Sequence, residues 1–369
     1  MIIGKMDSGG KKNLVMEYYR QIDRSKVQFD FICDSDSQAI PIVEIESMGG
    51  RIYRIPPYQH IFANMREMKK ICRENQYFIM HAWNSTMNLF PMWVGKSVGI
   101  PVRISESLSM AHKDDWKTKI KKVLKPMSKW FATHYMSCGE DCGRWQFGDK
   151  LFDAGKVDVF KTVINTRFND YNPELREKTR KEFGWENNIV VGHIGRLTPQ
   201  KNSVHLIEIF ASVVKKEPRS VLCLIGDGEL KNEVMAKIEE LGIEKHVNYL
   251  GRREDIQKFY NAMDCFLLPS LYEGLPVVGL EAECCGLPMF FSANISREAN
   301  ACELGRFIEL KESEDYWADE ILKAIKTNIS ERKGRVEELC VAGFDSANEA
   351  NRLQKYYFSA IANWKERQK

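Results

Sequence analysis

Short apolar runs alternate with amphipathic segments throughout the second half of the chain. The runs have the length of buried strands, and the segments between them repeat apolar residues at helical spacing. The expected strands are residues 189–194, 220–225, 247–250, 265–268 and 289–292, and the expected helices are residues 204–216, 229–241, 255–262 and the segment after residue 276. This alternation predicts βαβ units and a parallel sheet, in which ligands bind outside the carboxyl ends of the strands.

The first half of the chain is less regular but similar in kind. Its expected strands are residues 29–33, 51–55, 77–82, 102–105 and 134–137. A first strand is expected at Ile2 and Ile3, and a start that lacks a residue or two would explain why it is so short. The two halves together predict an α/β protein with two Rossmann-like domains.

The expected junction lies near residues 163–166, where strand character ends and the polar, turn-prone residues 168–173 follow. We therefore expect a first domain of residues 1–165 and a second of residues 166–345. A C-terminal helix within residues 346–369 is expected to return to the first domain.

Composition narrows the class of protein. The net charge of +3 is too small to suggest a nucleic acid partner. The first residues lack the apolar run of a signal peptide, and no stretch of about 18 apolar residues suggests a spanning helix. The ten cysteines are scattered without metal-site spacing. We therefore expect reduced thiols in the cytoplasm, with no disulfide and no metal site.

The most informative motif runs from Tyr272 to Ala282, directly after an apolar strand. Glu273 is expected in the loop at the strand's carboxyl end, and Glu281 about one turn inside the following helix. Pro276 suits the first helical position and Gly286 the C-terminal cap. The start of such a helix offers unpaired N–H groups that attract anions. An anionic ligand with many hydroxyl groups, such as a nucleotide-sugar, fits both features.

A second motif, residues 195–202, also follows a strand. Gly195 permits a tight turn, and Arg196 and Lys201 form a suitable pair of cations for a diphosphate. The alternative interpretation is two ordinary surface cations.

Two weaker motifs follow the next two expected strands, residues 220–225 and 247–250. Gly228 would permit close approach of a ligand, and Asp227 is expected to cap the following helix. Arg252 and Arg253 follow the third strand, where a nucleobase or a plain turn would fit.

Taken in order, these motifs resemble the retaining glycosyltransferases of family 4 (group 1), which have the GT-B fold. The type that acts in capsular and exopolysaccharide synthesis is the most similar. The motifs are Gly-Arg-Leu-x-x-x-Lys-Asn at 195–202, Gly-Asp-Gly at 226–228 and Glu-Gly-Leu-Pro at 273–276 with a second Glu eight positions later. The resemblance covers nearly the whole chain. It implies an acceptor-binding first domain that faces a donor-binding second domain across a cleft.

The resemblance also implies roles for individual residues. Arg196 and Lys201 match the pair that binds the donor diphosphate, and Glu273 matches the residue that contacts the sugar hydroxyls. Glu281 matches the residue that holds the ribose. The other expected donor-binding residues are Gly195, Gly228, Arg252, Arg253, Gly274, Leu275 and Pro276. Because cations and a helix end stabilise the leaving diphosphate in this family, no metal or other cofactor is expected.

The resemblance is partial in the first half. Gly9 and Gly10 match a glycine loop that faces the donor phosphate, but Lys11 and Lys12 stand where relatives have a small residue and Glu. These lysines either add attraction for phosphate or are simply solvated.

His81 and Ser107 are the expected acceptor-side residues. His81 matches the first His of a family segment, although a structural role is equally open for it. Glu106 stands where relatives often carry a His near the reacting sugar. It is expected to be catalytic, either orienting an acceptor hydroxyl or stabilising positive charge. The other interpretation of Glu106 is weak or lost activity.

A basic segment spans residues 113–131, with seven lysines between Lys113 and Lys129. Apolar residues recur in it at helical spacing: Trp116, Ile120, Val123, Met127 and Trp130. A basic amphipathic helix with aromatic residues is typical of membrane-surface binding. The alternative is an ordinary helix that packs on the first sheet.

The sequence therefore predicts a retaining, metal-independent hexosyltransferase. It would move a sugar from a nucleoside-diphosphate sugar to a glycan or polyprenyl-lipid-linked acceptor in surface polysaccharide synthesis, at the inner face of the membrane. Uridine diphosphate is favoured by its frequency in the family. Two alternatives remain: a non-catalytic sugar-nucleotide-binding partner subunit, motivated by Glu106, Lys11 and Lys12, and a nucleotide-sugar epimerase of the same fold.

Overall fold

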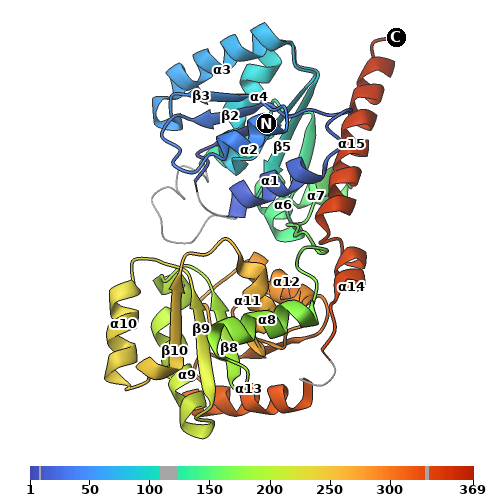
Figure 1. Ribbon diagram of the computed structural model, residues 1–369. Helices are drawn as coiled ribbons and strands as arrows, with labels where there is room; N and C mark the ends of the chain where they lie inside the picture. The colour runs from blue at the N-terminus through green and yellow to red at the C-terminus, as the bar shows by residue number, and fades with distance from the viewer. Residues whose placement is uncertain (8–9, 109–122, 329–331) are drawn as a thin grey trace. The chain divides into compact units, whose positions relative to one another are not determined.

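The computed structural model describes residues 1–7, 10–108, 123–328 and 332–369. The chain forms two compact units (Figure 1). The first unit comprises Met1–Val163 and Ser346–Lys369, and the second comprises Ile164–Asp345. The break falls where the sequence loses strand character.

The first unit contains a parallel sheet with the strand order β3-β2-β1-β4-β5-β6-β7. Its strands are β1 (Ile2–Gly4), β2 (Phe31–Asp34), β3 (Ile52–Ile55), β4 (Ile79–Ala82), β5 (Val102–Ser107), β6 (His134–Ser137) and β7 (Val157–Val159). Its helices are α1 (Gly10–Gln21), α2 (Ile42–Ser47), α3 (Ile61–Asn75), α4 (Leu89–Ser97), α6 (Glu140–Phe147), α7 (Asp149–Asp153) and α15 (Ser346–Glu366), with the 3₁₀ turns Tyr58–His60, Ser85–Asn88 and Lys125–Met127.

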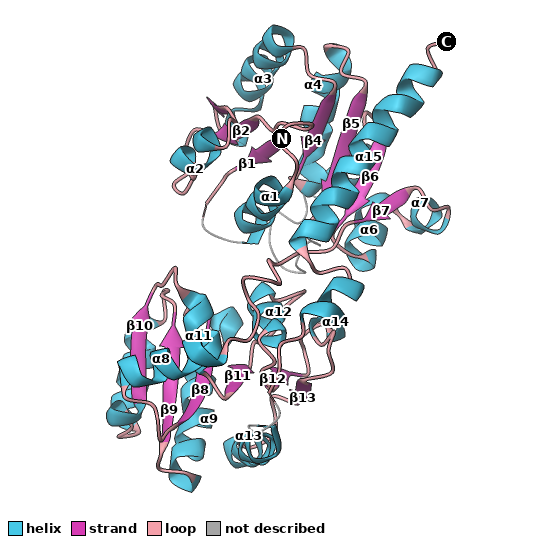
Figure 2. Cartoon of the chain, turned by 45° about the vertical axis from the view of Figure 1, so that its right-hand side comes forward, coloured by secondary structure: helices cyan, strands magenta, loops and turns pink. Residues whose placement is uncertain are grey.

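Helices cover both faces of this sheet (Figure 2). On one face, Val102 and Ile104 of β5 pack with buried residues of α1 and α15. On the other face, Met80 and Ala82 of β4 pack with α3 and α4. The C-terminal helix α15 therefore belongs to the first unit, and its Tyr357 is part of that core.

The second unit contains a parallel sheet with the strand order β10-β9-β8-β11-β12-β13. Its strands are β8 (Ile189–Ile194), β9 (Ser220–Ile225), β10 (Val247–Gly251), β11 (Cys265–Leu268), β12 (Met289–Ser292) and β13 (Gly305–Ile308). Its helices are α8 (Pro173–Phe183), α9 (Ser203–Lys216), α10 (Lys231–Glu240), α11 (Ile256–Ala262), α12 (Val277–Cys284), α13 (Glu314–Asn328) and α14 (Val336–Val341), with the 3₁₀ turns Pro199–Lys201, Glu244–His246 and Arg297–Ala299.

Successive residues of β8 face opposite sides of this sheet. Val191 packs with α9, α10 and α13, whereas Val190 and Ile194 pack with α11 and α12. The structure confirms the predicted α/β class with two Rossmann-like domains. In each sheet the strand order reverses once, between β1 and β4 and between β8 and β11. Ligands of such sheets bind at the carboxyl ends of the strands beside this reversal.

The structure differs from the expected elements at the edges of both sheets. The edge strands β7 and β13 were not predicted, because only one residue of each is buried and neither has a continuous apolar run. Pro276 is the N-cap residue of α12 instead of its first helical residue. Among the described residues, no helix has the length and apolar character needed to cross a membrane.

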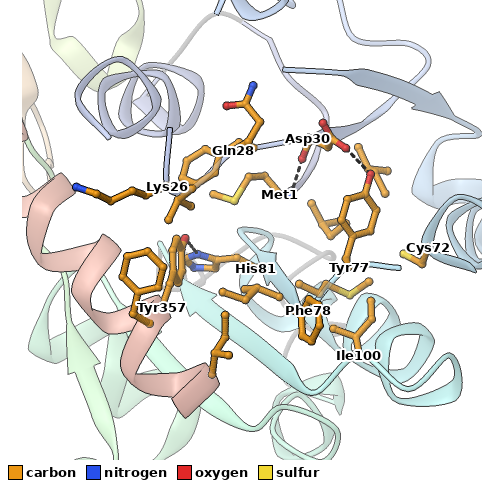
Figure 3. Close-up of a pocket in the computed structure, with 18 residues that line it drawn as sticks. Met1, Lys26, Gln28, Asp30, Cys72, Tyr77, Phe78, His81, Ile100 and Tyr357 are labelled. Carbon is orange, nitrogen blue, oxygen red and sulfur yellow. Dashed lines mark hydrogen bonds between the residues drawn. The ribbon is translucent and has the colours of Figure 1, made fainter. Parts of the chain in front are cut away.

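A pocket of about 310 Å³ lies in the first unit at the amino ends of β1 and β4, beside α15 (Figure 3). Its walls are mostly apolar, with His81 and Tyr357 on one side. Tyr77 donates a hydrogen bond of 2.5 Å to Asp30 on the other side. Because ligands of parallel sheets bind at the opposite edge, this pocket is not part of the candidate site.

Candidate functional site

Three loops of the second unit meet at the carboxyl edge of its sheet. The N–H of Gly195 donates to the carbonyl of Ile225 at 3.0 Å, and the N–H of Leu197 donates to the carbonyl of Asp227 at 3.2 Å. A methyl group on Gly226 would lie 1.8 Å from the Gly195 oxygen, and one on Gly228 would lie 2.2 Å from the Leu197 oxygen. Glycine is therefore required at both positions, since any side chain would push the loops apart.

Lys201 and Glu273 contact each other directly. The Nζ atom of Lys201 lies 2.6 Å from Oε1 of Glu273, and their side chains are 15% and 11% exposed. Two further bonds join their loops: Leu271 N–H to the carbonyl of Gln200 at 2.8 Å, and Gln200 Nε2 to the carbonyl of Tyr272 at 3.2 Å. The loops after β8 and β11 thus bring a predicted cation and a predicted carboxylate together beside the strand-order reversal.

Arg196 and the start of α12 complete this edge. Arg196 is exposed, so its guanidinium is open to an approaching anion. Gly274 is also exposed, and Pro276 caps α12 without a side-chain hydrogen bond. The first turn of this helix presents N–H groups that the helix itself does not satisfy. Gly274, Leu275 and Pro276 therefore lie where the sequence placed them, with the cap shifted by one residue.

Glu281 is held by a residue that the sequence did not indicate. Its Oε2 atom accepts a hydrogen bond of 2.8 Å from the hydroxyl of Tyr260 on α11. Burial and the nearby Glu281 carboxylate raise the pKa of Tyr260 well above its usual value, so its hydroxyl stays a donor. No signal in the sequence distinguishes Tyr260 from an ordinary core tyrosine.

The two arginines after β10 behave differently from each other. Arg252 is largely exposed, and its Nε atom lies 3.8 Å from the carboxylate of Asp227. Arg253 pairs with Asp255 at 2.6 Å and lies over the ring of Phe259, 5.5 Å from its centre. Arg252 is thus available at the loop edge, whereas Arg253 is engaged locally.

Asp227 does not cap a helix, contrary to expectation. The helix α10 begins at Lys231, and its N-cap residue is Leu230. The carboxylate of Asp227 accepts a bond of 3.0 Å from the N–H of Gly228 instead. The helix starts later than the sequence indicated, which leaves Asp227 in the loop.

In the first unit, Glu106 lies inside the fold instead of facing a substrate. Val102, Ile104 and Glu106 alternate onto the face of β5 that α1 and α15 cover. Glu106 and His81 are each 1% exposed, and Oε2 of Glu106 lies 2.7 Å from Nε2 of His81. Both side chains are buried, so the prediction that they contact an acceptor is wrong.

Tyr357 on α15 extends this buried pair, because its hydroxyl lies 2.8 Å from Nδ1 of His81 (Figure 3). Burial raises the pKa of Glu106 well above its usual value and lowers that of His81 well below. The network thus fastens the C-terminal helix to strands β4 and β5.

The other predicted site residues of the first unit lie near the carboxyl ends of β1, β5 and β6. Ser107 is buried, and its hydroxyl donates to the carbonyl of Cys142 at 3.1 Å. Gly10 is exposed at the start of α1, whereas Gly9 lies outside the described residues. Lys11 is partly buried, and its ammonium is engaged within the first unit. Its Nζ atom donates to the carbonyl of Ile3 and, at 2.9 Å, to Asn84 Oδ1.

The expected independence of metal stays a prediction. Within the described ranges, His205, Glu208 and Glu314 form a group whose ligand atoms lie within 4.8 Å of one another. Lys237 lies 3.8 Å from Glu208, and an ammonium so close to this carboxylate weakens its attraction for a cation.

Comparison with known proteins places these features in a family. A family model described as glycosyl transferases group 1 matches residues 175–338. EpsF of Bacillus subtilis, named as a glycosyltransferase, is 30% identical over 365 residues, which cover 96% of this chain and 95% of EpsF. The Escherichia coli UDP-Gal:alpha-D-GlcNAc-diphosphoundecaprenol alpha-1,3-galactosyltransferase is 23% identical over 381 residues, which cover 96% of this chain and 95% of that enzyme.

The solved structure of Alr3699/HepE from Anabaena in complex with UDP has the same fold. The two chains superpose with a TM-score of 0.74 at 19% identity, over 97% of this chain and 100% of that one. This likeness confirms the predicted fold class.

Proposed function

The chain belongs to the group 1 glycosyltransferases, and we propose that it transfers a sugar from a nucleoside-diphosphate sugar to a glycan or lipid-linked acceptor with retention of configuration. The contact between Lys201 and Glu273 beside the strand-order reversal carries this proposal. Membership in a family of transferases favours this activity over the two alternatives that the sequence left open.

Donor binding would replace the contact between Lys201 and Glu273 with contacts of each residue to the donor. The Lys201 ammonium and the Arg196 guanidinium would contact the diphosphate, and Glu273 would accept hydrogen bonds from the sugar hydroxyls. Glu281, held by Tyr260, would bind the ribose. The N–H groups at the start of α12, which the helix itself does not satisfy, would face the phosphate nearest the sugar.

In the transfer step, the bond between the anomeric carbon and the phosphate oxygen breaks, and the acceptor oxygen bonds to the same face of that carbon. The departing diphosphate takes the acceptor proton, so the enzyme supplies no nucleophile. Negative charge grows on the diphosphate as the bond breaks, and Arg196 and Lys201 stabilise that charge.

The names of two relatives support the proposed classes of donor and acceptor. Alr3699/HepE was solved with UDP, and the E. coli relative is named for transfer to a sugar on diphosphoundecaprenol. We therefore propose a UDP-sugar donor and a polyprenyl-diphosphate-linked acceptor in surface polysaccharide synthesis.

Nucleotide-sugars should stabilise the protein in proportion to their affinity. At a ligand concentration of about 100 Kd the expected gain is about 2.7 kcal/mol, which a rise in melting temperature reports. We expect UDP-sugars to raise the melting temperature more than GDP- or ADP-sugars do. The measurement is a thermal-shift series with each nucleotide-sugar and the matching free sugar as control. A series in which no nucleotide-sugar raises the melting temperature would contradict the proposal.

We further propose that the first unit binds the membrane surface through an aromatic and basic patch. Val123, Trp130 and Trp93 are 70%, 58% and 49% exposed. Trp93 stacks on Phe131 at 6.4 Å, and the ammonium of Lys96 lies 5.3 Å from the centre of the Phe131 ring. Exposed Val123 and Trp130 argue against the alternative of an ordinary helix packed on the sheet. Residues 113–122 of the basic segment lie outside the described residues.

Vesicle binding tests this patch. The parent protein should sediment with vesicles of phosphatidylcholine and phosphatidylserine, and high salt should release it from them. The double variant Trp93→Ser, Trp130→Ser should bind at least several-fold more weakly. Tyr316→Ser removes an aromatic side chain of similar exposure, 47%, from the second unit and serves as the control. Equal sedimentation of all three proteins would refute the assignment of the patch.

A further inference from the structure

A buried histidine lies directly beneath the loop that carries Arg196 and Lys201. His193 is the penultimate residue of β8 and is 0% exposed. Its ring is nearly parallel to that of Phe266, with centres 6.4 Å apart. Its Nδ1 atom lies 2.8 Å from the carbonyl oxygen of Leu267 on the neighbouring strand β11. Because a carbonyl oxygen only accepts, Nδ1 carries the hydrogen and Nε2 presents a lone pair.

This lone pair has no donor in the arrangement seen here. Among the described residues, no group forms a hydrogen bond with Nε2 of His193. Burial, and then the nearby Lys201 ammonium, lower the pKa of His193 to about 4, so the ring is neutral at physiological pH. A buried acceptor without a donor is rare in folded proteins and marks a place where a partner is expected.

Lys201 is a cation near this lone pair. A methyl group placed on Gly195 would lie 3.0 Å from Nε2 of His193 and 3.6 Å from Cε of Lys201. The two side chains therefore flank one point on the loop, which also explains why residue 195 has no side chain. In this arrangement the ammonium of Lys201 is held by Glu273 at 2.6 Å.

We propose that His193 is a positioning residue for Lys201: when a donor sugar occupies Glu273, Nε2 accepts an N–H of the Lys201 ammonium and holds it against the diphosphate. The inference rests on the proposed function and deepens it. An ammonium has three N–H donors, so Lys201 can contact His193 and the diphosphate at once. A neutral acceptor is suited to this task, because a second cation beneath the loop would repel Lys201.

The test combines variants of both residues. His193→Phe keeps a ring on Phe266 and removes both nitrogens, whereas His193→Gln keeps an acceptor near the position of Nε2. With a UDP-sugar as donor, His193→Phe should lower kcat by about 10- to 100-fold, the range seen when an outer partner of a site group is removed. KM for the donor should change little, since the contact matters most as charge grows on the diphosphate. His193→Gln should recover part of the loss.

A double-mutant cycle separates positioning from packing. In a Lys201→Met background, His193→Phe should cause no further loss of kcat, because nothing remains for it to position. An equal loss in both backgrounds, or no loss in the parent, overturns the proposal. Full turnover by Lys201→Met alone would refute the proposed donor site itself, a different pattern from failure of the His193 role.

His246 provides the matched control. Its Nδ1 atom also bonds to a backbone carbonyl, that of Ser220 at 3.0 Å, but at the amino end of β9. His246→Phe should leave kcat unchanged. If His193→Phe does not fold, His193→Gln and His193→Asn place an amide near Nε2 and Nδ1 respectively. The proposal requires higher turnover from the Gln variant, and the reverse order overturns it.

Discussion

Replacing Lys201 with methionine should lower kcat by about 10²–10³, the loss typical of one charge-stabilising donor in a transition state. Methionine has nearly the length of lysine but no charge, so the loop keeps most of its packing. Arg196→Met should cause a loss of the same order, because both cations face the charge that grows on the leaving diphosphate. Initial rates with the nucleotide-sugar selected by thermal shift provide the measurement, with melting temperatures to verify folding.

Lys258 offers a matched control for Lys201 in the same unit. Its side chain is 18% exposed and pairs with Glu182 at 2.9 Å, so Lys258→Met also removes a partly covered, ion-paired ammonium. That variant should keep its turnover, since Lys258 lies on α11 and its partners Glu182 and Asp255, the latter at 3.2 Å, are outside the loops after β8 and β11. Near-normal turnover by both Arg196→Met and Lys201→Met would contradict the donor-site assignment.

The central strands of the second sheet were predictable because they are buried on both faces. Residues 189–194, 220–225 and 265–268 are mostly apolar, and they coincide with β8, β9 and β11. The edge strands β7 and β13 escaped prediction because polar residues interrupt their short apolar pattern and most of their positions are only partly buried. The edge strands β3 and β10 were nevertheless predicted, so an edge strand is missed when it also lacks a local apolar pattern.

The loops of the site could be placed from motifs, but their contacts could not. Lys201 and Glu273 were expected on neighbouring loops, whereas their pairing depends on how β8 and β11 lie side by side. The partners Tyr260 of Glu281 and Tyr357 of His81 are 21 and 276 positions away in sequence. Nothing in a local pattern encodes such a contact, because tertiary packing alone creates it.

Glu106 shows how a motif position can mislead. It follows a strand-like run, so the sequence indicated a residue at the mouth of a site. In the structure β5 continues to Ser107, and α15 covers the face to which Glu106 points. The covering helix lies far along the chain, and its docking turned a predicted catalytic group into an internal one.

The buried pair of Glu106 and His81 should make stability depend on pH. The titratable groups around the carboxyl are His81 on β4, Tyr18 on α1, Tyr357 on α15 and Cys138 after β6. These four groups offer the carboxyl no positive charge at neutral pH, so burial dominates and favours its protonated form. The carboxyl then donates to Nε2 of His81, and Nδ1–H of His81 donates to the Tyr357 hydroxyl.

The sign of the pH dependence follows from the opposite pKa shifts of Glu106 and His81. The folded pKa of Glu106 lies well above the unfolded value of about 4.3, so the unfolded state loses a proton that the folded state keeps. Stability from this group is complete below about pH 4.3 and falls as the pH rises towards the folded pKa. For His81 the folded pKa is lowered, so its contribution is complete above about pH 6.5 and is lost as the pH falls below that value.

The variant Glu106→Gln isolates the carboxyl, because an amide can still donate to Nε2 of His81 but cannot ionise. Between pH 5 and pH 8 the stability of the variant relative to the parent should rise by about 1.4 kcal/mol per pH unit, or about 4 kcal/mol in all, while the folded carboxyl stays protonated. Denaturant unfolding of both proteins at each pH provides the measurement. Glu74→Gln, at an exposed position of α3, is the control for the substitution itself. A difference that stays constant across this range would contradict the raised pKa of Glu106, because it would mean that the folded pair holds no proton that unfolding releases.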